Sequence, residues 1–224
     1  MTLPLFDEEA PQAPQRVADG AVLLRHWATA QGPQWMAAVQ QVLAQRPWGK
    51  AYTPSGLAMS VQTTCCGPLG WGVDAHGYCY SPVDMTTGRP WPAMPVFLQQ
   101  QAVAAAAAAG YPGFAPDVCL INRYLPGAKM GLHRDDDESD LRAPIVSVSL
   151  GLPAGFRWGG LLRHGPVRRW PLQHGDVLVW GGASRLVYHG VSPLADGRHH
   201  LLGAERWNLT FRMARRAYHP VLAG

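Results

Sequence analysis

Two segments in the first half of the chain are predicted to be helices, the first of them by the spacing of its apolar residues. From Pro33 to Gln45 the apolar positions recur with helical periodicity, at Trp35, Met36, Val39, Val42 and Leu43. Gly32 and Pro47 stand at the two ends of this segment, where helices usually begin and end. A second segment runs from about Met94 to Ala109 and is ended by Gly110. We therefore predict two helices before residue 111.

The second half of the chain shows short apolar runs separated by glycine-rich turns, which is typical of strands. The predicted strands are Val118 to Tyr124, Ile145 to Leu150, Phe156 to Leu162, Asp176 to Trp180, Leu186 to Val191 and Arg206 to Met213. Many short strands after a helical start favour two packed sheets with helices on one face. The predicted fold class is α+β, mainly β: a double-stranded β-helix, or jelly roll, with N-terminal helices packed on one sheet.

The same patterns divide the chain into segments of one domain. Residues 1–19 are rich in Pro, Gln and acidic residues, and we expect a flexible N-terminal arm. Residues 20–216 form the single domain, with a hairpin-like flap at about 50–82 and the jelly roll at about 118–213. Residues 217–224 form a C-terminal tail. No internal repeat or linker divides the domain.

Composition narrows the cellular setting of the protein. A chain of 224 residues that is 47% hydrophobic suits one domain with a sizeable core. The longest uniform apolar run, Ala102 to Ala109, is far short of the ~20 residues of a membrane span, and we expect no membrane association. The four cysteines have neither zinc-ligand spacing nor an obvious disulfide framework, so we expect reduced thiols and a cytoplasmic protein.

A histidine and an aspartate two residues apart are the first candidates for chemistry. If the backbone of Gly131-Leu132-His133-Arg134-Asp135 is extended, the side chains of His133 and Asp135 leave on one face. With His189 as a third ligand they would form the two-histidine, one-carboxylate triad that holds iron(II). The alternative is a surface histidine beside a solvated acid, because a lone His-x-Asp pair is common by chance.

Alternation along the last predicted strand places polar side chains on one face of it. Arg206, Asn208, Thr210 and Arg212 share that face, and Trp207, Leu209, Phe211 and Met213 share the other. Guanidinium groups bind carboxylates through two charge-assisted hydrogen bonds, so this face suits a dicarboxylate. Asn122 and Tyr124 share a face of an earlier strand in the same way. The alternative is an ordinary strand with a solvent-facing side.

These residues, taken together, resemble a known family. The motifs Asn122-Arg123-Tyr124, His133-Arg134-Asp135 with Glu138, His189, and Arg206-x-Asn208-x-x-x-Arg212 are similar to those of the AlkB-type alkylated-DNA-repair dioxygenases, which depend on iron(II) and 2-oxoglutarate. The likeness runs from about Gly20 to Arg216. It includes the stretches Pro90 to Pro95 and Ala143 to Pro153.

The resemblance implies a role for each of these residues. His133, Asp135 and His189 would bind iron(II). Arg212 would pair with the far carboxylate of the cosubstrate 2-oxoglutarate, and Arg206 with the end nearer the metal. Asn122, Tyr124 and Asn208 would supply supporting hydrogen bonds. With dioxygen, the enzyme would hydroxylate an alkyl group on a base nitrogen, and the product would release an aldehyde.

The resemblance also implies a nucleic-acid substrate. Its damaged base must leave the duplex, or already be single-stranded, to reach the metal. The flap would be a nucleotide-recognition hairpin. Trp71 would stack on the base with His133 on the other side, Tyr78 and Tyr80 would line the pocket, Asp137 would meet the exocyclic amino group, and Arg163 would hold the nucleotide. The expected substrates are 1-methyladenine and 3-methylcytosine type lesions in single- or double-stranded DNA, with RNA as a further candidate. We expect a monomer.

Two other functions stay open at this point. One is a related oxygenase acting on a small molecule or a protein side chain. The other is a nucleic-acid-binding module of the same fold without turnover. The complete triad with both arginines argues against the binding module, and Trp71, Tyr78 and Asp137 argue against the other oxygenase.

Positive charge adds only weak support for an anionic partner. The net charge is +4, and only Lys50 and Lys129 are lysines. Arg168, Arg169, Arg215 and Arg216 could form a patch that follows a nucleic-acid backbone. The alternative is that they are simply solvated, as charged pairs at turns and chain ends usually are.

Overall fold

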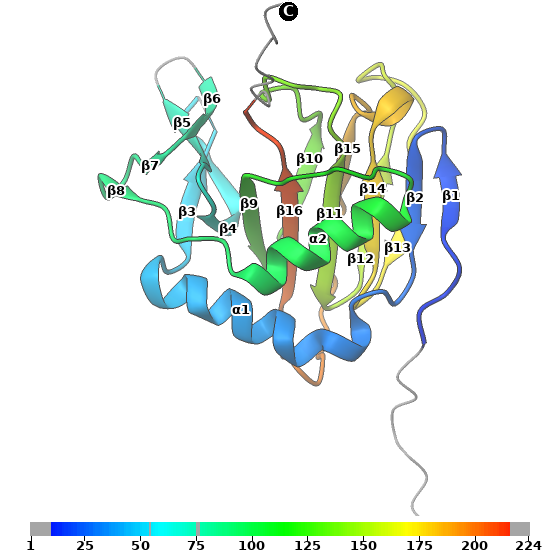
Figure 1. The fold of residues 1–224 in the computed structure, drawn as a ribbon, viewed down its shortest axis with the longest axis horizontal. Helices are drawn as coiled ribbons and strands as arrows, with labels where there is room; N and C mark the ends of the chain where they lie inside the picture. The colour runs from blue at the N-terminus through cyan, green and yellow to red at the C-terminus, as the bar shows by residue number, and fades with distance from the viewer. Residues whose placement is uncertain (1–9, 54, 75–76, 216–224) are drawn as a thin grey trace, which may run out of the picture.

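The computed structural model describes residues 10–53, 55–74 and 77–215. Residues 1–9 of the expected arm, Arg216 and the expected tail 217–224 lie outside this part of the chain. Two β-sheets face each other, and two helices cover the outer face of the larger sheet (Figure 1). The predicted jelly roll with helices on one sheet is confirmed.

The larger sheet contains eight strands in the order β1-β2-β14-β11-β16-β9-β4-β3. Their bounds are β1 Gln15–Ala18, β2 Ala21–Leu24, β14 Val177–Trp180, β11 Ile145–Gly151, β16 Arg206–Arg212, β9 Val118–Tyr124, β4 Ala58–Cys66 and β3 Gly49–Tyr52. Every neighbouring pair is antiparallel. The sheet therefore takes strands from both ends of the described chain.

The smaller sheet contains four antiparallel strands in the order β10-β15-β12-β13. Their bounds are β10 Met130–His133, β15 His189–Val191, β12 Ala154–Trp158 and β13 Arg168–Leu172. Phe156 and Trp158 of this sheet lie in one buried cluster with Leu178 and Trp180 of the larger sheet. This cluster is the core between the two sheets.

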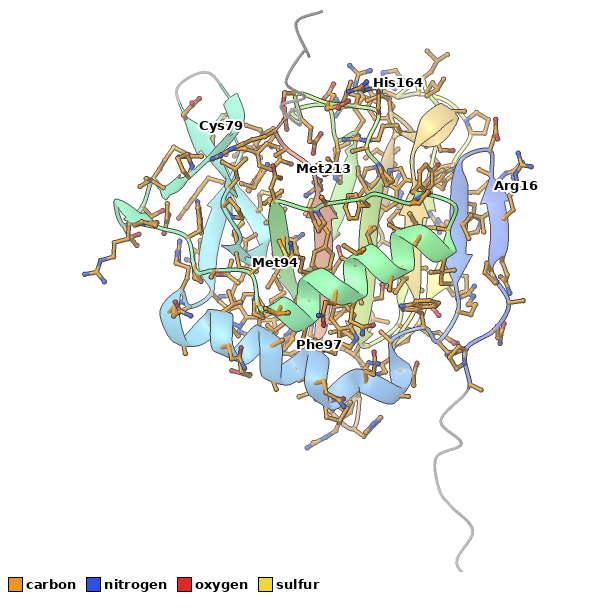
Figure 2. The ribbon with its side chains drawn as sticks, viewed as in Figure 1. Arg16, Cys79, Met94, Phe97, His164 and Met213 are labelled. Atoms are coloured by element: carbon orange, nitrogen blue, oxygen red, sulfur yellow. The ribbon has the colours of Figure 1, made fainter. Side chains whose placement is uncertain are left out.

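Helices α1 (Gly32–Gln45) and α2 (Val96–Ala108) match the two predicted helices to within two residues at each end. Trp35 of α1 is fully buried and contacts Phe97 of α2, with ring centroids 5.3 Å apart. Phe97 is labelled in Figure 2. Both helices pack on apolar residues of the larger sheet such as Leu209 and Phe211. Just past the end of α2, Gly110 has φ +89°, a conformation that glycine adopts without strain. In the described part of the chain, no helix has the length and apolar character needed to cross a membrane.

Several boundaries differ from the prediction. Gln15–Ala18, expected in the flexible arm, form the edge strand β1 by pairing with β2. Of the expected flap, β3 and β4 belong to the larger sheet because β4 pairs with β9. The hairpin of β5 (Gly70–Asp74) and β6 (Gly77–Ser81) forms a sheet of its own, followed by the short pair β7 (Val83–Asp84) and β8 (Arg89–Pro90).

The smaller sheet was the least predictable part of the fold. Neither β10 nor β13 was expected. The strand expected from Phe156 to Leu162 ends at Trp158, and the one expected from Leu186 begins only at His189. These strands are short and hold glycine, proline and charged residues, so their hydrophobic patterns are weak.

Candidate iron and 2-oxoglutarate site

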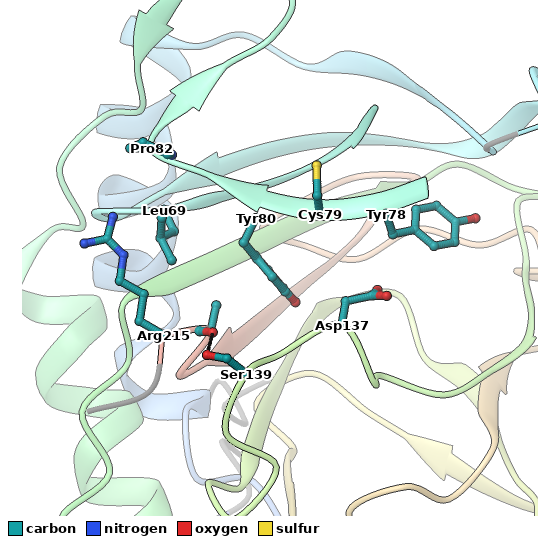
Figure 3. Close-up of a pocket in the computed structure, with 9 residues that line it drawn as sticks. Leu69, Tyr78, Cys79, Tyr80, Pro82, Asp137, Ser139 and Arg215 are labelled. Carbon is teal, nitrogen blue, oxygen red and sulfur yellow. Dashed lines mark hydrogen bonds between the residues drawn. The ribbon is translucent and has the colours of Figure 1, made fainter. Parts of the chain in front are cut away.

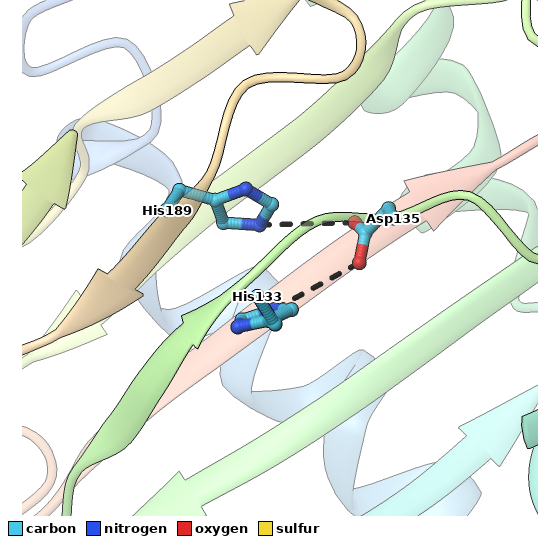
Figure 4. Close-up of side chains that lie close together, drawn as sticks. All are labelled: His133, Asp135 and His189. Atoms are coloured by element: carbon cyan, nitrogen blue, oxygen red, sulfur yellow. Dashed lines mark ion pairs between the residues drawn. The ribbon is translucent and has the colours of Figure 1, made fainter. Parts of the chain in front are cut away.

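The two candidate histidines meet where the strands β10 and β15 pair. His133 is the last residue of β10 and lies directly opposite His189, the first residue of β15. Their ring centroids are 4.5 Å apart. Asp135 lies in the loop just after β10, and its carboxylate faces both rings (Figure 4). One ligand atom from each residue lies within 4.8 Å of the others, which confirms the expected convergence.

The spacing of this cluster fits a bound metal ion. The Nε2 atom of His133 is 3.8 Å from Oδ1 of Asp135, and the Nε2 atom of His189 is 3.9 Å from Oδ2. Two atoms that each bind one ion at about 2.1 Å can be up to about 4.2 Å apart. A single ion can therefore contact the carboxylate and either imidazole.

Backbone carbonyls orient both histidines for metal binding. Nδ1 of His133 lies 2.9 Å from the carbonyl oxygen of Gly131, and Nδ1 of His189 lies 3.0 Å from that of Val187. A carbonyl can only accept, so Nδ1 carries the proton in each ring. In the neutral imidazole, Nε2 then offers its lone pair toward Asp135.

Electrostatics keep His189 and Asp135 in the protonation states that a metal requires. Burial and, after it, the neighbouring His133 lower the pKa of His189 to about 4, so its ring is neutral near pH 7. Burial alone would raise the pKa of Asp135, but the Arg212 guanidinium and the two histidines more than offset this and hold that pKa well below its usual range. Asp135 is therefore ionised.

A network of buried charges holds the loop that carries Asp135. Arg212 donates to Oδ2 of Asp135 from Nη2 at 2.6 Å and from Nε at 3.0 Å. Arg185 donates to the backbone carbonyl of Asp135 at 2.6 Å and to the Glu138 carboxylate at 2.9 Å. The hydroxyl of Tyr80, from β6, donates to the other oxygen of Glu138 at 2.7 Å. The β5–β6 hairpin and the metal-ligand loop are thus joined through Glu138.

The polar face of β16 is buried rather than exposed. All seven residues of this strand are buried, because the apolar face lies under the helices and the polar face looks into the space between the sheets. Asn208 donates to Ser147 at 2.8 Å, and Arg206 donates to Ser149 at 3.0 Å. The Arg206 guanidinium lies 5.1 Å from the centre of the Tyr124 ring, and burial lowers the pKa of Arg206.

Unsatisfied donors on this face fit an anionic ligand. Nε and Nη1 of Arg206 and Nη1 of Arg212 are buried and have no hydrogen-bond partner in the described part of the chain. A buried guanidinium N–H without an acceptor is costly, and such groups normally have a partner. A dicarboxylate such as 2-oxoglutarate would supply acceptors for both side chains.

The expected order of the two arginines along the site was wrong. Arg212, assigned to the far carboxylate, contacts the metal-ligand candidate Asp135 directly. Arg206 lies six residues away along β16, a distance of about 20 Å between Cα atoms. On β16, Arg212 is therefore the arginine next to the candidate metal ligands, and Arg206 is the one farther from them.

The β5–β6 hairpin brings two of the predicted aromatic residues, Tyr78 and Tyr80, to a pocket beside the loop that carries Asp135. Tyr78, Tyr80 and Asp137 line this pocket of about 490 Å³, together with Ser139 and Arg215 (Figure 3). Burial and the neighbouring acids Glu138 and Asp136 raise the pKa of Asp137 to about 6, so the group is still mostly ionised at pH 7.

Neither Trp71 nor Arg163 is among the residues that line this pocket. The Trp71 ring stacks on Tyr78 of the neighbouring strand, with ring centroids 5.2 Å apart and an interplanar angle of 29°. Tyr78 thus occupies one face of the indole. Arg163 is exposed in the loop between β12 and β13. That loop begins beside His189, since Trp158 pairs with His189.

Sequence reasoning missed two residues that organise the site. Glu138 entered only as part of a motif, and Arg185 was not singled out. A buried arginine between Ser184 and Leu186 gives no local signal, because its partners Asp135 and Glu138 are 50 and 47 residues away in the chain. The apolar surroundings of Arg185 in the sequence were the one available hint.

Comparisons with known proteins agree with this geometry. The family model described as 2OG-Fe(II) oxygenase superfamily matches residues 20–212. The chain is 54% identical over 213 residues to the alpha-ketoglutarate-dependent dioxygenase AlkB of Escherichia coli (strain K12), covering 95% of this chain and 98% of that protein. It is 45% identical over 185 residues to an AlkB homolog of Caulobacter vibrioides (strain NA1000 / CB15N), covering 81% and 82%.

A solved structure extends the likeness to three dimensions. The structure of OsALKBH1 superposes with a TM-score of 0.77 at 27% identity, covering 89% of this chain and 99% of that one. With a matching family model over most of its length and a relative of 54% identity, the chain belongs to the 2OG-Fe(II) oxygenase superfamily and, within it, to the AlkB dioxygenases.

Proposed function

We propose that this protein removes alkyl groups from ring nitrogens of damaged bases in DNA, with RNA as a further substrate. The observation that carries the proposal is the convergence of His133, Asp135 and His189 at one end of the polar face of β16. On that face the buried side chains of Arg206 and Arg212 keep N–H donors without acceptors. The likeness to the AlkB dioxygenase over 95% of the chain supports it.

His133, Asp135 and His189 would hold iron(II), and β16 would hold 2-oxoglutarate. Arg212 would meet the carboxylate at the metal end and Arg206 the other carboxylate, with Tyr124, Asn122 and Asn208 lining the path between them. Asn122 and Tyr124 are buried and lie opposite Asn208 and Arg206 in the register of β9 and β16. This order follows from the contact of Arg212 with Asp135.

When bound, the iron and the cosubstrate would supply, with dioxygen, the hydroxylation of the alkyl carbon, with succinate and carbon dioxide as the other products. The hydroxylated group then leaves the base nitrogen as an aldehyde, and the nitrogen recovers its electron pair. The protein would contribute by holding the alkyl carbon close to the bound iron, because correct positioning of the reacting groups lowers the barrier of such a reaction.

The pocket beside the hairpin would receive a flipped base. The base would stack on the face of Trp71 opposite Tyr78, with His133 on its other side, and Tyr80 would line the pocket wall. Asp137 would accept a hydrogen bond from the exocyclic amino group. An N-alkylated adenine or cytosine is cationic, so the ionised Asp137 favours it over the undamaged base. Arg163 would hold the nucleotide from the opposite rim.

Mass spectrometry of a methylated oligonucleotide tests the proposal. We expect loss of the methyl mass from a 1-methyladenine oligonucleotide only when iron(II), 2-oxoglutarate and the protein are all present. Succinate formed without any stimulation by the oligonucleotide would indicate an oxygenase for a different substrate. No succinate under any condition would indicate a binding module.

We further propose that the protein works as a monomer in the cytoplasm. All four cysteines, Cys65, Cys66, Cys79 and Cys119, are free, which fits a reducing compartment. Light scattering of the purified protein would test the monomer, and a mass of two chains would contradict it.

A further inference from the structure

The hairpin of β12 and β13 extends the row of metal ligands to the free edge of the smaller sheet. His133 lies opposite His189, His189 opposite Trp158, and Trp158 opposite Arg168. Three strand spacings separate His133 from Arg168, a distance of about 14 Å. A nucleic-acid strand whose target base lies at His133, Asp135 and His189 would reach Arg168 within a few nucleotides.

This hairpin carries only positive charge. Between Ala154 and Leu172 the chain has four arginines and neither aspartate nor glutamate. They are Arg157, Arg163, Arg168 and Arg169. All four lie in the loop or in the two register pairs next to it. The loop is anchored beside the metal cluster, because the Gly159 N–H donates to the Tyr188 carbonyl at 2.7 Å and the Tyr188 N–H donates to the Gly160 carbonyl at 3.0 Å.

The arrangement of the arginines is unfavourable without an anionic partner. Arg157 lies directly opposite Arg169, and like charges at opposed positions destabilise a sheet. The described part of the chain offers neither of them an ion pair, and Nε of Arg157 is buried without a hydrogen-bond acceptor. An array of this kind is stabilised when phosphate groups approach it.

The opposite rim of the metal site has no comparable excess of positive charge. In the loop after β10 the exposed Asp136 pairs with Arg134, and Asp137 is exposed as well. A phosphate backbone is therefore attracted to the hairpin rather than to this loop. Leu161 and Leu162, 59% and 77% exposed at the loop tip, add an apolar contact for sugars or bases.

We propose that the β12–β13 hairpin is a second nucleic-acid contact that binds phosphates of the strand flanking the target base. Arg168 would do so from the sheet face that carries His189, and Arg157 and Arg169 from the other face. The inference rests on the proposed function and goes beyond it. It assigns a surface that acts on affinity for long substrates rather than on the chemistry at the metal.

The test compares R168Q/R169Q with the matched control R89Q/R198Q, which removes the same charge from exposed arginines outside the hairpin. Fluorescence anisotropy would give the Kd for a single-stranded methylated oligonucleotide at several salt concentrations. Each lost phosphate contact lowers the salt slope by about 0.7, so R168Q/R169Q should lower it by about 1.4. The affinity gap to wild type then grows about seven-fold between 200 and 50 mM salt. R168K/R169K keeps the charge and should restore the slope.

Turnover on substrates of two lengths separates this surface from the catalytic site. For R168Q/R169Q we expect a higher KM with a long methylated oligonucleotide, an unchanged kcat, and unchanged kinetics with a methylated trinucleotide that cannot reach the hairpin. Salt slopes equal to those of R89Q/R198Q would overturn the inference. So would an equal loss of activity on the trinucleotide.

Two further outcomes distinguish the inference from its basis. If the wild type dealkylates neither substrate, the proposed function is wrong. The salt dependence of Kd would still test whether the hairpin binds nucleic acid. If polyglutamate of matched charge competes for the hairpin as well as an oligonucleotide does, the surface is a general polyanion site and the assignment to nucleic acid is wrong.

Discussion

The two rims of the metal site differ in how they use charge. On one side, the loop after β10 contains Asp135 and Glu138, both buried and both bonded to arginines that are buried as well. On the other side, Arg168 and Arg169 of the β12–β13 hairpin are exposed, and neither has an ion pair in the described part of the chain. One rim satisfies its charges internally, and the other leaves them for solvent or a partner.

This difference separates charges that position groups from charges that attract ligands. A buried ion pair gains little net stability, but breaking it leaves an uncompensated charge, so it fixes the geometry of whatever it touches. An exposed cation is screened and mobile, and contributes mainly through long-range attraction. The predictions below compare changes on the buried rim with matched changes on the surface.

The largest effect is expected from Asp135→Ala, which removes a metal ligand and the partner of Arg212. Turnover should fall below detection, and isothermal titration should show that Mn(II) no longer binds. The control Asp136→Asn changes an exposed carboxylate in the same loop that pairs with Arg134, and it should keep both properties. Full repair activity in D135A would overturn the metal assignment.

Breaking the buried pair of Arg185 and Glu138 should cause the next largest change. Arg185→Met leaves Glu138 without its main cation and should lower the free energy of unfolding by about 3–5 kcal/mol. For a chain of this size that corresponds to a drop in Tm of roughly 6–20 °C. Arg142→Gln removes an exposed arginine that pairs with Asp140 and should leave the Tm unchanged in the same calorimetric scan. Equal shifts in the two variants would mean that burial does not decide how much an ion pair contributes to stability.

A smaller effect, confined to the cosubstrate, is expected from Arg206→Gln. Losing charge-assisted hydrogen bonds worth about 1.5–3 kcal/mol should raise the KM for 2-oxoglutarate roughly 10- to 150-fold. Steady-state succinate assays would measure it. R198Q, which changes an exposed arginine, is the control and should match wild type. An unchanged KM in R206Q would remove Arg206 from the cosubstrate site.

The smallest effect is expected from Trp71→Ala, which removes the proposed stacking surface for the base. Substrate use should weaken by about 1–3 kcal/mol, the worth of one base–aromatic stack. The kcat/KM for a methylated oligonucleotide should fall, whereas succinate formed without oligonucleotide should not. If both fall equally, Trp71 supports the fold of the hairpin rather than the base.

Local sequence patterns predicted the helices and strands whose buried and exposed faces can be recognised within the segment itself. The helix of residues 32–45 and the alternation of Arg206 to Arg212 were legible because periodicity reports which side chains share a face. The short strands β10 and β13 were missed, because four or five residues with glycine, proline and charge carry too little pattern. Pairing with β15 and β12 holds them in place instead.

The sequence by itself determined the kinds of group available: two imidazoles and a carboxylate for a metal, two arginines on one strand face, and a jelly roll to present them. Only the tertiary structure decided that Arg212 rather than Arg206 lies at the metal, that Trp71 stacks on Tyr78, and that Arg185 holds the ligand loop. The physical reason is that side-chain periodicity specifies a face, whereas the end of a strand that meets a given loop depends on contacts between residues far apart in the chain.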